Sequence, residues 1–126
     1  MELAYVDTSC VVAIVLGEHG AAAVERRLLA HRELVSSNLL EAELRAAVAR
    51  ERRRAAEIPA GLMSWIIPER PLSDEIARVL EAGHVRGAAC WHLACALYLT
   101  PEPKAISFLT LDERQQTVAR ALGFQL

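Results

Sequence analysis

The fold is indicated first by residues 3–9, which have the sequence LAYVDTS. Leu3–Val6 is a short apolar run that ends in an acid, and this pattern predicts a strand buried within a sheet. Thr8 or Ser9 is expected to cap a helix that stops at Gly17. A buried strand followed directly by a helix is the repeating unit of a parallel sheet covered by helices.

The same alternation of short apolar strands and helices continues along the chain. Further strands are expected at residues 34–35 and 105–109, with an additional edge strand at 124–126. Helices are expected at 21–30, from Ser37 or Asn38 to about Arg53, at 73–82, at 86–99 and at 112–122, and residues 59–67 are expected to form a helix or turn. This order predicts an α/β protein in which a short, mostly parallel central sheet lies between two layers of helices.

Size and composition favour one soluble domain. The 126 residues correspond to one ordinary domain, so we expect residues 1–126 to fold as a unit. The hydrophobic fraction of 53% is enough for a packed core and argues against disorder. Residues 1–7 are too short and acidic for a signal peptide, and the chain has no long uncharged apolar run, so we expect a cytoplasmic location without a membrane segment.

The three cysteines, Cys10, Cys90 and Cys95, all lie in apolar stretches. An odd number in such surroundings favours packed, reduced thiols over a disulfide framework. None lies at zinc-site spacing from another cysteine or a histidine, so a zinc site is not expected.

Asp7 directly follows the first expected strand. Ligands of parallel sheets bind outside the carboxyl ends of the strands, which is where this carboxylate would lie. A helix cap or a turn acid explains an aspartate at this position equally well.

Glu43 lacks an evident structural role. On a helix that starts near Asn38 it shares a face with Leu39 and Ala47, and a carboxylate in an apolar stripe is costly unless a positive group meets it. Glu41, by contrast, lies four residues before Arg45. A functional role for Glu43 is therefore favoured, although a buried arginine such as Arg86 could also pair with it.

Asp112 follows the strand expected at 105–109, and Thr110 offers a hydroxyl at the same strand end. Asp112 could simply cap the last helix, with Gln115 completing a capping box. If Asp7, Glu43 and Asp112 converge, their charges repel unless a cation neutralises them, and oxygen ligands suit Mg²⁺ or Mn²⁺.

Four stretches resemble the PIN domain, and in particular the VapC-type toxin ribonucleases. They are YVDTS from residue 5, LLEAELRAAV from residue 39, RGAACWHLACAL from residue 86 and FLTLDERQQTVARALGF from residue 108. They occur in order, at compatible spacing, over essentially the whole chain. The resemblance implies a three-layer α/β/α PIN-like fold and a Mg²⁺-dependent (or Mn²⁺-dependent) nuclease with an acidic metal site.

The resemblance also assigns residues. Asp7 matches the first acid and Glu43 the second, and Thr110 and Asp112 match the polar pair at the end of the late strand. Asp7 is then the main metal ligand, Glu43 an indirect ligand or base, and Asp112 a water-mediated ligand. Thr8 and Ser9 are supporting polar residues beside Asp7.

The chain departs from the family pattern at its third acid. That acid belongs to a motif Asp-x-x-His-Leu-Ala, and aligning His92, Leu93 and Ala94 with it places Ala89 at the aspartate position. The side chain of Ala89 is expected to line the site without offering a ligand, which predicts weaker metal binding and reduced cleavage. His92 itself is expected to pack in the core rather than bind metal.

Positive charge for an RNA substrate is available at the end of the helix that carries Glu43. The candidates are Arg50, Arg52, Arg53 and Arg54, although a solvated helix end favoured by the helix dipole explains them equally well. Because the net charge is −2, any contact with nucleic acid must come from such a local patch.

Three functions remain open. The first is the endoribonuclease toxin of a type II toxin–antitoxin pair, which by resemblance is a homodimer blocked by an antitoxin. The second is a PIN-fold module that has lost a ligand and binds RNA or an antitoxin without cleaving. The third is a scaffold whose acids are helix caps.

Overall fold

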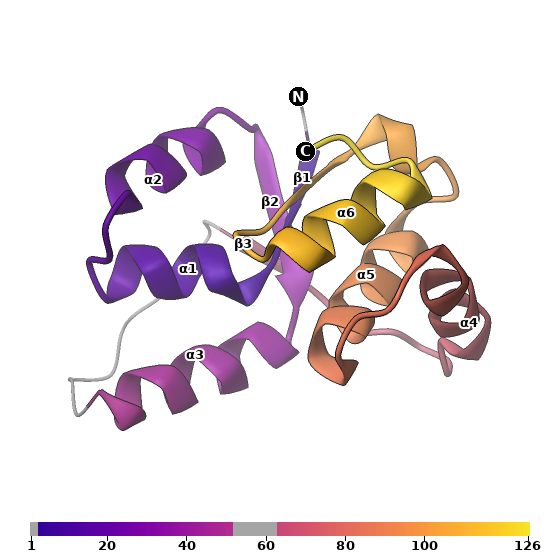
Figure 1. Ribbon diagram of the computed structural model, residues 1–126, viewed down its shortest axis with the longest axis horizontal. Helices are drawn as coiled ribbons and strands as arrows, with labels where there is room; N and C mark the ends of the chain where they lie inside the picture. The colour runs from indigo at the N-terminus through magenta and orange to yellow at the C-terminus, as the bar shows by residue number, and fades with distance from the viewer. Residues whose placement is uncertain (1–2, 52–62) are drawn as a thin grey trace.

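The computed structural model describes residues 3–51 and 63–126, which form a sheet with helices on both faces (Figure 1). Four strands of this part of the chain pair in the order β3-β2-β1-β4, and every pairing is parallel. The strands are β1 Leu3–Val6, β2 Glu33–Ser37, β3 Met63–Ile66 and β4 Ser107–Leu109. The helices are α1 Thr8–Val15, α2 Ala21–Leu29, α3 Leu39–Arg50, α4 Ser73–Ala82, α5 Gly87–Leu99 and α6 Glu113–Leu122, with a 3₁₀ helix η1 at Pro103–Ala105. The expected α/β fold class is confirmed.

The side chains of β1 show why helices cover both faces of the sheet. Successive residues of a strand point to opposite faces. Tyr5 therefore stacks on Phe108 in a core shared with α4, α5 and α6, while Ala4 and Val6 belong to a second core shared with α1, α2 and α3. Because β1 is central and buried on both faces, it is apolar throughout, and the fold has three layers.

The register of the sheet places the acids at one edge. Val6 of β1 pairs with Leu109 of β4, and the backbone N–H of Asp7 donates to the carbonyl oxygen of Leu109 over 2.9 Å. Asp7 and Thr110, the residues that directly follow β1 and β4, therefore lie side by side. Each strand end leads into a helix, α1 after β1 and α6 after β4.

The expectation of a helix or turn at 59–67 is wrong for its second half. Met63–Ile66 is the edge strand β3, paired with β2, while residues 59–62 lie outside the described residues. Ser64 and Trp65 are exposed and only Ile66 is buried. The strand therefore lacks the buried apolar run that identifies a central strand, and pairing with β2 together with the packing of Met63 and Ile66 holds it in place.

Three other strand expectations need correction. The strand expected at 105–109 is only Ser107–Leu109, because η1 occupies the chain just before it. Residues 124–126 form no strand; a single parallel bridge joins Ser107 to Gln125. The strand expected at 34–35 is longer than expected, Glu33–Ser37.

Helix ends also differ from expectation. Asp7, and not Thr8 or Ser9, caps α1, because its side chain accepts a hydrogen bond from the backbone N–H of Ser9. The helix α3 ends at Arg50 instead of near Arg53, which lies outside the described residues. The expected pair of Glu41 and Arg45 is present at 2.9 Å.

The cysteines are buried free thiols, as expected. Burial raises the pKa of Cys10 to about 12 and that of Cys95 to about 11, so neither is a ready nucleophile. In the described part of the chain, no helix combines the length and the hydrophobicity that crossing a membrane requires.

Candidate active site

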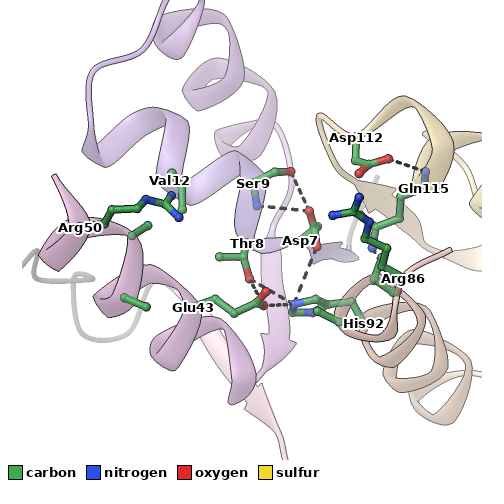
Figure 2. Close-up of a pocket in the computed structure, with 14 residues that line it drawn as sticks. Asp7, Thr8, Ser9, Val12, Glu43, Arg50, Arg86, His92, Asp112 and Gln115 are labelled. Atoms are coloured by element: carbon green, nitrogen blue, oxygen red, sulfur yellow. Dashed lines mark hydrogen bonds and ion pairs between the residues drawn. The ribbon is translucent and has the colours of Figure 1, made fainter.

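A cavity of about 500 Å³ lies beyond the carboxyl ends of β1 and β4 (Figure 2). Asp7 reaches it from the end of β1, Glu43 from α3 and Asp112 from the residue before α6. The structure thus brings the three sequence-predicted acids to one cavity, although they are far apart in the chain. Thr8 and Ser9 line the same cavity.

Asp7 is held by three donors that all use the same carboxylate oxygen. Its Oδ2 accepts hydrogen bonds from the Ser9 N–H (3.2 Å), the Ser9 hydroxyl (2.7 Å) and the Thr110 hydroxyl (3.0 Å). The residue is only 7% exposed, and burial of a carboxylate is costly unless it is hydrogen-bonded. Within the described residues no hydrogen bond reaches Oδ1, which lies 3.8 Å from His92 Nε2, so this oxygen has lone pairs available for a ligand.

Glu43 is also held through one oxygen. Its Oε1 accepts hydrogen bonds from the Thr8 hydroxyl and from His92 Nε2, each at 2.8 Å. The hydrogen bond from His92 lowers the pKa of Glu43 below its ordinary value, against a smaller opposing effect of burial. Glu43 is therefore ionised at neutral pH. Its partner is His92, and not the buried arginine considered as an alternative.

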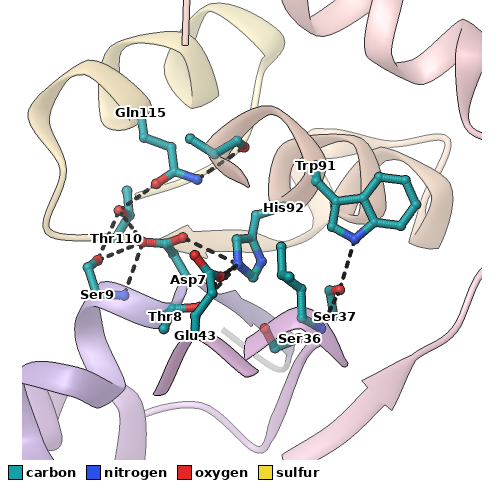
Figure 3. Close-up of polar contacts among 12 residues, drawn as sticks. Asp7, Thr8, Ser9, Ser36, Ser37, Glu43, Trp91, His92, Thr110 and Gln115 are labelled. Atoms are coloured by element: carbon teal, nitrogen blue, oxygen red, sulfur yellow. Dashed lines mark hydrogen bonds and ion pairs between the residues drawn. The ribbon is translucent and has the colours of Figure 1, made fainter. Parts of the chain in front are cut away.

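The buried hydroxyl of Tyr5 orients His92, whose ring points toward Glu43 and Asp7 (Figure 3). The Tyr5 hydroxyl accepts the Ser37 backbone N–H at 3.0 Å and lies 2.6 Å from His92 Nδ1. Because Glu43 can only accept, the neutral imidazole carries its proton on Nε2 and accepts at Nδ1 from Tyr5. The expected core packing of His92 is confirmed, since it is 1% exposed, but its ring also reaches the site.

Thr110 and Gln115 connect Asp7 to the start of α6. The single hydroxyl proton of Thr110 can go to Asp7 Oδ2 (3.0 Å) or to Gln115 Oε1 (2.9 Å). Asp112 caps α6 by accepting the Gln115 N–H at 2.9 Å. The expected capping box does not form, because the Asp112 N–H donates to the Thr110 hydroxyl at 3.1 Å instead of to the Gln115 side chain. The Gln115 amide donates to the Ala89 carbonyl oxygen at 3.3 Å.

Two arginines line the cavity from opposite sides, Arg50 from the end of α3 and Arg86 from the residue before α5 (Figure 2). Neither forms an ion pair or a hydrogen bond with another described residue. The other predicted RNA-binding residues, Arg52, Arg53 and Arg54, lie outside the described residues.

Comparison with known proteins identifies the family of this fold. The family model for the PIN domain matches residues 4–121, which is nearly the whole chain. The chain belongs to the PIN domain family. No curated protein and no solved structure matches it. PIN domains are generally nucleases, commonly ribonucleases, and the cavity described above is where this PIN domain gathers its acids.

Ala89 occupies the position where the resemblance places a third acid. Its side chain lines the cavity, as expected, and it is half-buried on the first turn of α5. A methyl group offers no metal ligand. The first turn of α5 contains no acidic residue at all, so this side of the cavity carries no negative charge from α5.

The acids of this PIN domain suit a hydrated ion better than a directly coordinated one. Within residues 3–51 and 63–126, no group of three or more His, Cys, Asp or Glu side chains is placed to hold a metal ion. Asp7 Oδ1, Glu43 Oε2 and Asp112 Oδ2 nevertheless accept no hydrogen bond from the described residues. Mg²⁺ prefers oxygen ligands and keeps several waters, so the donor chemistry fits an ion bound largely through its hydration shell.

Sequence reasoning missed Tyr5, because its partners His92 and Ser37 lie on other elements and no local signal marks it. It did name Arg86, Gln115 and His92, but as a partner of Glu43, a capping residue and a core residue, and not as residues that line the cavity.

Proposed function

We propose that this PIN domain is a Mg²⁺- or Mn²⁺-dependent endoribonuclease, the toxin of a type II toxin–antitoxin pair, with activity reduced by Ala89. One observation carries the proposal. Asp7 is almost fully buried, yet its Oδ1 accepts no hydrogen bond from the described residues and lies 3.8 Å from His92 Nε2, in a cavity that Glu43 and Asp112 also line. Carboxylates gathered in this way are stabilised by a shared cation, and a helix cap alone does not require the other two acids.

The roles of the side chains follow from their contacts. A bound ion would supply a water of lowered pKa and would neutralise charge on the phosphate oxygens. Asp7 would hold the ion through Oδ1, while Ser9 and Thr110 fix its other oxygen. Glu43, kept ionised and oriented by His92 and Thr8, would orient the attacking water or accept its proton through Oε2. Asp112, exposed at the rim, would act through a water.

A second candidate function is a PIN module that binds RNA or an antitoxin without cleaving. Two points favour it: Ala89 lines the cavity at the position where the resemblance places an acid, and no three-residue metal group is present in the described residues. The two candidates share the fold and differ in one measurable property, metal-dependent cleavage.

The proposal includes the partners that a VapC-type toxin has. These are an RNA substrate, an antitoxin protein, a second copy in a homodimer and a cytoplasmic location. An arginine from an antitoxin would pair well with the acids of the cavity, because charge-assisted bonds to carboxylates are among the strongest polar contacts. Light scattering on the purified chain measures its oligomeric state directly.

Cleavage of an end-labelled RNA tests the function. We expect slow cleavage by the wild type with Mg²⁺ or Mn²⁺ and none with EDTA or with Asp7→Asn. Restoring the carboxylate in Ala89→Asp should raise the rate about tenfold. Ala77→Asp, an equal change on an exposed turn of α4, is the matched control and should leave the rate unchanged.

Each outcome separates the candidates. RNA that is retained but never cleaved, by the wild type and by Ala89→Asp alike, favours the binding module. Cleavage that continues in EDTA or in Asp7→Asn rejects the proposed metal site.

A further inference from the structure

A second, smaller cavity lies beside the acidic one and has the opposite charge balance. It measures about 250 Å³ and is lined by Val85, Arg86, Ala89, Asp112 and Arg114. Arg86, Ala89 and Asp112 line both cavities, so the two are contiguous. The larger one has three carboxylates against two arginines, and the smaller one has two arginines against one carboxylate.

The side chains of the two arginines of the smaller cavity make no polar contact within residues 3–51 and 63–126. Arg86 precedes α5 and Arg114 lies in the first turn of α6, and both side chains are exposed. Neither makes an ion pair or a hydrogen bond with another described residue. Two exposed guanidinium groups at the mouth of a small cavity suit a phosphate, which accepts several hydrogen bonds at once.

Ala89 bears on why Arg86 pairs with no described residue. Arg86 is the N-cap residue of α5 and position 89 lies three residues later on its first turn, so a carboxylate at position 89 is expected close to Arg86. Alanine removes that partner, and α5 has no other acid in its first turn. An alanine at position 89 therefore lowers the affinity of the larger cavity for a cation and raises the affinity of the adjacent smaller cavity for an anion.

We propose that Arg86 and Arg114 form a binding subsite for an RNA backbone phosphate next to the one at Asp7. The inference rests on the proposed function in one respect, namely that the strand held there is RNA. The subsite fixes the position of the strand relative to the acids, and it gives affinity without base selectivity. Because it uses only the chain's own cations, it operates without a metal ion.

Binding of a fluorescent single-stranded RNA in EDTA, measured by anisotropy at several salt concentrations, tests the subsite. We expect Arg86→Gln and Arg114→Gln each to weaken binding roughly tenfold and to reduce the slope of log affinity against log salt by about 0.7. Arg78→Gln, on an exposed position of α4 outside both cavities, is the matched control and should change neither quantity. All three side chains are exposed, and circular dichroism verifies that the variants fold.

Ala89→Asp gives a second, independent measurement. The new carboxylate should pair with Arg86, so metal-free RNA binding should weaken and Arg86→Gln should cost less affinity in that background than in the wild type. Additive effects would contradict the proposed pairing.

The outcomes keep the two proposals apart. Unchanged affinity and salt slope in both arginine variants overturn the subsite, even if the wild type cleaves RNA. Loss of affinity in these variants supports the subsite, even if the wild type never cleaves and the nuclease proposal fails. A wild type that does not bind RNA in EDTA overturns the subsite as well.

Discussion

At the scale of single residues, the hydrogen-bond donors of the site contact only one of the two oxygens of each carboxylate. Ser9 and Thr110 hold Asp7 Oδ2, and Thr8 and His92 hold Glu43 Oε1. This arrangement leaves the second oxygen of each carboxylate available to a cation. Hydrogen bonds are stronger when the acceptor is an ionised carboxylate, as it is at Glu43.

The bond from His92 to Glu43 makes stability depend on pH. The pKa of Glu43 is lower in the folded protein than its ordinary value of 4.5, so the ionised form stabilises the fold. This contribution is full above the ordinary pKa and is lost as the pH falls through the lowered one. In EDTA, urea unfolding should show Glu43→Gln less stable than the wild type by about 1 kcal/mol at neutral pH, and equal to it in acid.

Glu41→Gln is the matched control for this pH effect. Glu41 pairs with Arg45 on the exposed face of the same helix, so its loss should cost only about 0.3 kcal/mol. A Glu43→Gln difference that stays constant across the pH range would show that the bond from His92 does not depend on the charge of Glu43.

Tyr5→Phe should destabilise the protein by about 1–3 kcal/mol, because it leaves the buried Ser37 N–H without its acceptor. Urea unfolding at neutral pH measures the loss. Tyr98→Phe serves as the control, since the Tyr98 hydroxyl accepts only an exposed N–H, that of Glu69, at 3.4 Å, and its loss should change stability by less than about 0.5 kcal/mol. Equal effects of the two substitutions would contradict the role given to the Tyr5 hydroxyl.

At the scale of elements, two acids of the site are also helix caps. Asp7 caps α1 and Asp112 caps α6. Capping uses one carboxylate oxygen and leaves the other for chemistry, so the structural and functional explanations of these acids do not exclude each other. From the sequence, capping and ligand binding are competing explanations of each acid. In the structure one carboxylate oxygen caps the helix and the other remains available to a ligand.

Substitutions at Asp112 separate the two roles. Asp112→Ala removes the cap of α6 and should cost about 1 kcal/mol of stability, while Asp112→Asn keeps a capping oxygen and should cost only a few tenths. Both remove the negative charge, so both should reduce Mg²⁺-dependent cleavage of RNA. Thermal unfolding and the cleavage rate, measured on the same preparations, distinguish cap from ligand. If Asp112→Asn retains the wild-type rate, Asp112 is only a cap.

The elements also show where sequence patterns fail. The central strand β1 was predictable because it is apolar on both faces, and the amphipathic or apolar helices were predictable from their periodicity. The edge strand β3 was not, because Ser64 and Trp65 are exposed and the stabilising hydrogen bonds come from β2. Pairing with a neighbour leaves no mark in the strand's own sequence.

At the scale of the whole molecule, the parallel sheet brings the acids together. Asp7 and Asp112 are near opposite ends of the chain, yet β1 and β4 are adjacent and end at the same edge, while α3 carries Glu43 over that edge. The adjacency of β1 and β4 in the parallel sheet thus positions the larger cavity, the two arginines that flank it and the smaller cavity beside it.

Metal binding is a property of that whole arrangement. Millimolar Mg²⁺ or Mn²⁺ should raise the melting temperature of the wild type by a few degrees, since a ligand that binds only the folded state stabilises it. Asp7→Asn should abolish the shift, and Ala89→Asp should enlarge it. Asp74→Asn, which removes an acid of α4 outside the cavity, should leave the shift intact. A shift of equal size in Asp7→Asn would place the ion elsewhere.

The sequence by itself determined which acids are available and which elements they end or begin. It placed Asp7 after a buried strand, Glu43 in an apolar stripe, Asp112 before a helix and an alanine where the family pattern has an acid. These conclusions follow from patterns within one element, where hydrophobic periodicity and cap residues act over a few positions along the chain.

Only the tertiary structure decided what each acid meets. The partner of Glu43 is His92, which the sequence places 49 positions away. That Arg86, beside Ala89, pairs with none of the described residues became visible only with both cavities in place. Hydrogen bonding and charge act through space, and the packing of α3, α5 and α6 on the ends of β1 and β4 sets those distances.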